Sequence, residues 1–134
     1  MRTRRADRSV LKGRLEKSQQ FYAAAEQLRS TTNDEDEIGD AYVTLLVHAG
    51  IAAADAICCS ALNEYAVGES HAEAIGLIRK VRPGGDQLAE ALARLLRLKS
   101  HAGYSAAPVS ADERKRARRA AEKLVTAARD RVVG

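Results

Sequence analysis

The chain has 134 residues, the usual size of one domain, and is long enough to bury a core without disulfides or a metal. Its residues are 46% hydrophobic but only 4% aromatic, so the core has to be built from Ala, Leu, Ile and Val, which favours an all-α bundle. No apolar segment follows the basic start, and the low-charge stretch 41–63 is rich in alanine and includes an aspartate, so we expect a cytoplasmic protein without a signal peptide or membrane span.

Residues 1–8 are expected to form a flexible basic end, and residues 9–134 to form one domain of about five antiparallel helices. The first helix is predicted over about 9–29, with Ser9 as its N-cap and apolar residues at helical spacing. It ends at 30–33, where Ser, Thr, Thr and Asn favour a turn.

The second helix is predicted over about 34–64 and begins with a run of acidic residues. Acids at this end compensate the helix dipole, and a metal-binding cluster is the alternative interpretation. Small residues at 50–55 should allow another helix to pack very closely. The segment 31–78 carries nine acidic residues and no basic one, so we expect basic neighbours to neutralise it within the fold, although a basic surface for nucleic acid is also consistent with this charge pattern.

The remaining helices are predicted at 71–81, 86–100 and 110–131. Ser70, Asp86 and Ser110 are their candidate N-caps, and Ser70 has a glutamate three residues later, as in a capping box. Residues 67–70 are expected to form a turn and residues 102–109 a loop, and no segment is predicted to form a strand.

The adjacent cysteines, Cys58 and Cys59, point about 100° apart on a helix and are interpreted as small core residues in a reducing compartment. The three histidines, His48, His71 and His101, lie on different predicted elements and lack the short spacing of a zinc site. We therefore expect neither a metal nor a cofactor.

His48 and Asp55 are seven residues apart on the second helix and therefore share one face. A carboxylate in such an apolar run needs a partner, which we expect to be a basic side chain of the fourth or fifth helix. The pair is interpreted either as structural or as part of a site. His71, at the start of the third helix, is likewise a structural or supporting residue.

A cluster of five polar residues closes the fourth helix: Arg94, Arg97, Lys99, His101 and Tyr104. Guanidinium and ammonium groups can hold phosphate, and an imidazole can transfer protons. The alternative interpretation is a solvated face that complements the negative end of the helix dipole.

The order of these segments resembles the HEPN domain, a helical module named for higher eukaryotes and prokaryotes nucleotide-binding. The resemblance covers about 34–125 and rests on HisAlaGlyIleAlaAlaAlaAspAlaIle at 48–57, SerHisAlaGluAla at 70–74 and LysSerHisAlaGlyTyr at 99–104. It implies a homodimer, and for many members a metal-independent ribonuclease toxin paired with a nucleotidyltransferase-fold antitoxin. RNA or a nucleotide would be the ligand. We also expect a dimer because the Ala-rich second helix should leave apolar surface uncovered.

The family motif is an Arg, four to six residues, and a His, often with a Tyr two positions after the His. In one register it falls on Arg94 and His101, which gives Arg94, His101 and Tyr104 catalytic roles, with Arg97 and Lys99 binding substrate and Asp55, His48 and His71 in support. In the other register Tyr104 is aligned with the family's Tyr, and the His position falls on Ala102. That register implies a catalytically silent module that binds a nucleotide or a protein.

Overall fold

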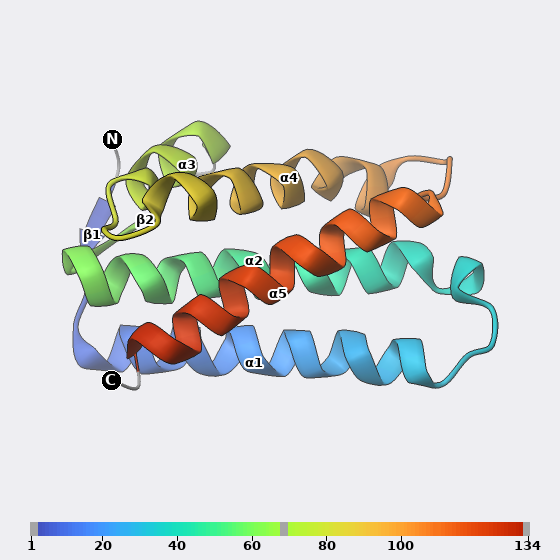
Figure 1. Cartoon of the computed structure of the whole chain (residues 1–134), viewed down its shortest axis with the longest axis horizontal. Helices are drawn as coiled ribbons and strands as arrows, with labels where there is room; N and C mark the ends of the chain where they lie inside the picture. The colour runs from blue at the N-terminus through green and yellow to red at the C-terminus, as the bar shows by residue number, and fades with distance from the viewer. Residues whose placement is uncertain (1–2, 68–69, 133–134) are drawn as a thin grey trace.

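The computed structural model describes residues 3–67 and 70–132, and over these residues the protein is an all-α helical bundle, as its composition predicts (Figure 1). The helices are α1 (Arg8–Ser30), α2 (Gly39–Leu62), α3 (His71–Arg79), α4 (Gly85–Tyr104) and α5 (Ala111–Val132). A short 3₁₀ helix, η1 (Glu35–Glu37), precedes α2, and two short strands, β1 (Thr3–Arg5) and β2 (Glu64–Ala66), pair with each other. The ends of the predicted turn at 67–70 are described, whereas Gly68 and Glu69 lie outside the described residues.

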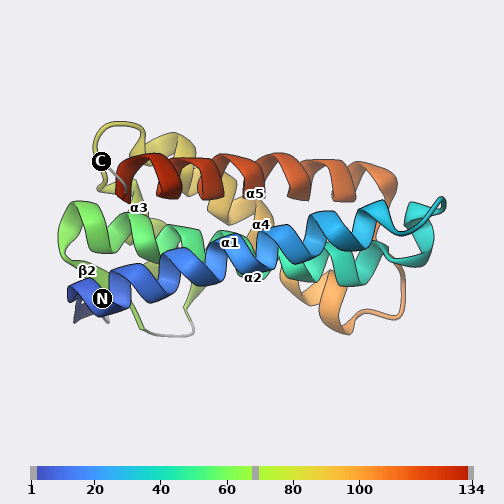
Figure 2. The ribbon, with the colours of Figure 1, turned by 90° about the horizontal axis from the view of Figure 1, so that it is seen from below.

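Helix α2 is the centre of the bundle. It packs against α1, α4 and α5, and α5 crosses it obliquely (Figure 1). Turned by 90°, the molecule shows α1 running in front of α2, with α5 lying above both (Figure 2). Within the described residues, α2 is the one helix long and apolar enough to cross a membrane, a test that the core helix of a soluble protein also passes. Most of the side chains of α2 are buried against the other helices.

The small residues of α2 allow the close approach predicted for 50–55. A Cβ atom at Gly50 would overlap Leu95 Cδ1 of α4, so any larger residue at this point would require the Leu95 side chain to move. The neighbouring Ala52, Ala53 and Ala54 are also buried. Close contact of this kind suits a core with few aromatic side chains.

The prediction that no segment forms a strand is wrong at two places. Thr3 pairs with Ala66 and Arg5 with Glu64 in an antiparallel ladder, and the Ala6 N–H donates to the Asn63 carbonyl at 2.9 Å. Asn63 ends α2 in the left-handed conformation, which turns the chain back toward its own start. The segment 1–8, expected to be a flexible end, thus contributes a strand and, through Asp7, the N-cap of α1.

The two longest predicted helices have different ends in the structure. The acidic run lies in η1 rather than in the first turns of α2, because the Asp34 carboxylate accepts from the Asp36 N–H and forms a separate turn. Helix α4 continues to Tyr104, through residues expected to form a loop, because Ala102 is buried in the core.

The predicted caps are partly correct. Ser70 and Ser110 accept hydrogen bonds from the backbone N–H groups of Glu73 and Glu113, as expected. Asp7 rather than Ser9 caps α1, and the residue at the N-cap of α4 is a glycine with positive φ, with Asp86 in the first turn.

Basic helices neutralise part of the acidic segment, as the charge pattern predicts. Arg14 of α1 pairs with Asp55 at 2.8 Å, and Arg114 of α5 pairs with Asp36 at 2.8 Å.

Candidate functional site

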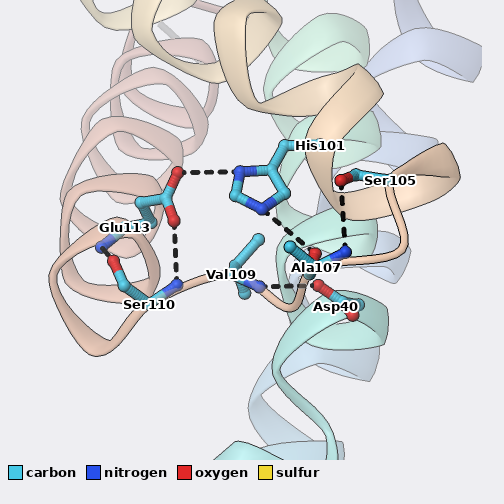
Figure 3. A network of polar contacts seen from close by, with 7 residues as sticks. All are labelled: Asp40, His101, Ser105, Ala107, Val109, Ser110 and Glu113. Atoms are coloured by element: carbon cyan, nitrogen blue, oxygen red, sulfur yellow. Dashed lines mark hydrogen bonds and ion pairs between the residues drawn. The ribbon is translucent and has the colours of Figure 1, made fainter.

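His101 lies at the junction of α4 and α5, in the polar network of Figure 3. Its Nδ1 atom is 3.1 Å from Glu113 Oε2, and its Nε2 atom is 3.1 Å from the Ala107 carbonyl oxygen. Glu113 also accepts from the Ser110 N–H at 2.8 Å, while Ser110 Oγ accepts from the Glu113 N–H at 3.1 Å. This reciprocal capping box begins α5 and anchors the imidazole to it.

Both ring nitrogens of His101 therefore face acceptors. A neutral imidazole has one N–H and can donate to only one of them, whereas the imidazolium donates to both. The bond from the Ser110 N–H, with a smaller contribution from His101, holds the pKa of Glu113 below its usual range and keeps this carboxylate charged. The network stabilises the loop that connects α4 to α5. The Val109 N–H of this loop donates a hydrogen bond to the Asp40 carboxylate, which links the loop to α2 as well.

The predicted cluster on α4 is divided between two faces of the helix. Arg94 and Arg97 precede His101 by seven and four residues, so they lie along its side of the helix. Both are exposed, and neither has an ion pair within the described part of the chain. Lys99 is two positions from His101, which turns it to roughly the opposite side.

Lys99 instead lines a groove between α2, α3 and α4, which has a volume of about 530 Å³. The groove brings together four of the predicted site residues: Asp55, His71, Lys99 and Tyr104. The rest of its lining is Ile51, Ala54, Cys58, Ala66, Ser70, Ala74, Leu77, Leu92, Leu96 and Ser100. Arg94, Arg97, His48 and His101 are not part of it.

Asp55 is paired, but its partner is not on the fourth or fifth helix as expected. Arg14 of α1 donates to Asp55 Oδ2 through both Nε, at 3.0 Å, and Nη2, at 2.8 Å. Burial raises the pKa of Asp55 to about 6, although the guanidinium opposes this shift. The prediction failed because α1 runs beside the face of α2 that carries Asp55.

His48 shares this face, as its spacing from Asp55 predicts. Its ring is 5.6 Å from the ring of Phe21 in a tilted arrangement, on the exposed side of the contact between α1 and α2. His48 and Asp55 therefore each contact α1, at separate positions two turns apart.

The two cysteines are buried, and burial raises the pKa of Cys58 to about 12 and that of Cys59 to about 11. Both thiols are thus protonated and unreactive at neutral pH. Within 3–67 and 70–132, no group of three or more His, Cys, Asp or Glu side chains is arranged to hold a metal ion.

Sequence reasoning missed Arg14 and Glu113, the two partners that decide what Asp55 and His101 do. Glu113 stands three residues after Ser110, the spacing of a capping box, which was a usable signal. Nothing local in the sequence distinguishes Arg14 from the other basic residues of its helix.

No family model matches the chain, and no curated protein is significantly similar to it.

Proposed function

We propose that the protein is a catalytically silent, HEPN-like helical module that acts by binding rather than by cutting RNA. The observation that carries this proposal is the bonding of His101. A general acid or base has to present a ring nitrogen to its substrate, and both nitrogens of His101 are taken by Glu113 and Ala107.

The alternative register of the family motif supports the same proposal. Aligning Tyr104 with the family's Tyr puts Ala102 at the His position, and Ala102 is buried in the core with 8% of its surface exposed. A methyl group there can pack but cannot transfer a proton. The setting implied by the resemblance is a cytoplasmic homodimer in a toxin–antitoxin or defence system, with a nucleotidyltransferase-fold protein, RNA or a nucleotide as partner.

A metal-independent ribonuclease is the second candidate. It is favoured by Arg94 and Arg97, which are exposed on the side of α4 that carries His101 and have no carboxylate partner among the described residues. For this activity, His101 would have to release the Ala107 carbonyl so that Nε2 could reach the 2′-hydroxyl of RNA.

Cleavage of a mixed RNA pool in EDTA separates the two functions. The assay compares the parent, freed of any bound protein, with His101→Gln, Arg94→Ala and, as a matched control, His71→Gln. We expect no cleavage by any of them. Cleavage by the parent that falls ~10²–10⁴-fold in His101→Gln and Arg94→Ala, but not in His71→Gln, would establish the ribonuclease instead.

A further inference from the structure

The floor of the groove between α2, α3 and α4 is aliphatic. Its accessible part is formed by Ile51 of α2, Ala74 of α3 and the exposed edge of Leu96 of α4, while Leu77 and Leu92 lie beneath it with 1% of their surface exposed. A saturated carbon chain laid on this floor would gain roughly fourfold in affinity for each methylene that becomes fully buried. The lining contains one phenol, that of Tyr104, and no other aromatic side chain apart from the imidazole of His71.

The polar lining of the groove is rich in hydrogen-bond donors. Lys99 is half-buried and pairs with no carboxylate among the described residues. Ser100 and Tyr104 add hydroxyl groups, and Tyr104 is 86% exposed, which makes it the most exposed large hydrophobic side chain that the structure describes. An ammonium group with neighbouring hydroxyls suits a carboxylate, since hydrogen bonds to a charged acceptor are stronger than neutral ones.

The charges in the groove limit the charge of its ligand. Asp55 also lines the groove, but its Oδ2 atom is held by two nitrogens of Arg14, so this pair is locally neutral. Lys99 is then the one lysine or arginine side chain of the lining, and it has no carboxylate partner among the described residues. One positive charge matches a singly charged anion, whereas a nucleoside triphosphate would bring several negative charges to it.

We infer that this groove is a binding site for an aliphatic monocarboxylate, with its carboxylate on Lys99 and its carbon chain over Ile51, Ala74 and Leu96. The inference does not depend on whether the protein cleaves RNA, because His101, Arg94 and Arg97 lie outside the groove.

Calorimetric titration of the full chain with octanoate tests the inference. We expect saturable one-to-one binding that weakens about tenfold or more in Lys99→Gln, since that change removes a charge-assisted hydrogen bond. Arg97→Gln is the matched control, because it removes one positive charge from the same helix outside the groove, and it should leave binding unchanged. Ala74→Leu should also weaken binding by narrowing the groove, and circular dichroism melts would show that each variant stays folded.

Three further probes separate the ligand classes. Octanol lacks the charge and acetate lacks the chain, so both should bind far more weakly than octanoate. Octanol binding as tight as octanoate, or octanoate binding untouched by Lys99→Gln, would reduce the site to nonspecific apolar adsorption and overturn the inference. ATP binding that depends on Lys99, in the absence of octanoate binding, would make the groove a nucleotide site and overturn the inference, and so would the absence of binding by any probe.

Discussion

Two opposing influences act on the carboxyl group of Asp55. Burial raises its pKa and Arg14 lowers it, and burial prevails, giving a value of about 6 compared with an ordinary 3.8. The folded protein therefore binds this proton more tightly than the unfolded chain does. The stability contributed by protonated Asp55 is fully present below the ordinary value and is lost as the pH rises toward 6.

The Asp55→Asn variant should remove this dependence. Relative to that of the parent, its free energy of unfolding is expected to increase between pH 4 and pH 6, by up to about 3 kcal/mol, because Asn does not acquire a buried charge. Urea denaturation of both proteins at several pH values measures the difference between their free energies of unfolding. The contributions of the other titrating groups cancel in this difference. A difference that stays constant over this range would contradict the raised pKa of Asp55.

His101 should contribute to stability through its contacts with Glu113 and the Ala107 carbonyl. We expect His101→Ala to lower the free energy of unfolding by about 1–2 kcal/mol, because it removes the imidazole that lies 3.1 Å from both Glu113 Oε2 and the Ala107 carbonyl oxygen. Chemical denaturation at neutral pH measures this loss. The control is His71→Ala at an exposed position, where a change within about 0.5 kcal/mol is expected. Equal effects of the two substitutions would mean that the network of Figure 3 does not stabilise the fold.

At the scale of the elements, the contact between α2 and α4 depends on Gly50. A methyl group there would overlap Leu95 Cδ1, so Gly50→Ala should destabilise the protein by about 1–3 kcal/mol, in spite of the higher helix propensity of alanine. Gly13→Ala on α1 is the matched control, because a Cβ atom there meets nothing within 4 Å, and it should stabilise by about 0.5–1 kcal/mol. Thermal melts show whether each substitution lowers or raises the melting temperature. A stabilising Gly50→Ala would show that the helices can move apart at no cost.

At the scale of the whole molecule, the described surface offers little apolar area for a dimer interface. The Ala-rich face of α2 is covered by the other helices, and Tyr104 is the sole large hydrophobic side chain exposed within the described ranges. The expectation of a homodimer therefore rests on the family resemblance, and its interface would have to be largely polar.

Sedimentation measures this directly. We expect a mass of about twice the 14.5 kDa of one chain at micromolar concentration, decreasing as salt is added, because polar interfaces are weakened by screening. A monomer at low salt and high concentration would contradict the dimer.

Helical periodicity and capping residues are local properties, so they could be identified in the sequence. All five helices were predicted, and so were the caps at Ser70 and Ser110 and the close packing at 50–55. The continuation of α4 to Tyr104 was missed, because burial of Ala102 outweighs the turn preference of its neighbours. The strands were missed because each of them has three residues, too few to show the alternation that predicts a strand.

The sequence by itself determined the class of fold, since the spacing of apolar residues and the scarcity of aromatics leave a helical bundle as the way to bury this core. Only the tertiary structure decided what the polar residues do. Lys99 and His101 are two positions apart in the chain, yet one lines the groove and the other binds α5. The physical reason is that a helix sends such neighbours to nearly opposite sides, and the packing of α2, α3 and α5 around α4 determines what each side meets.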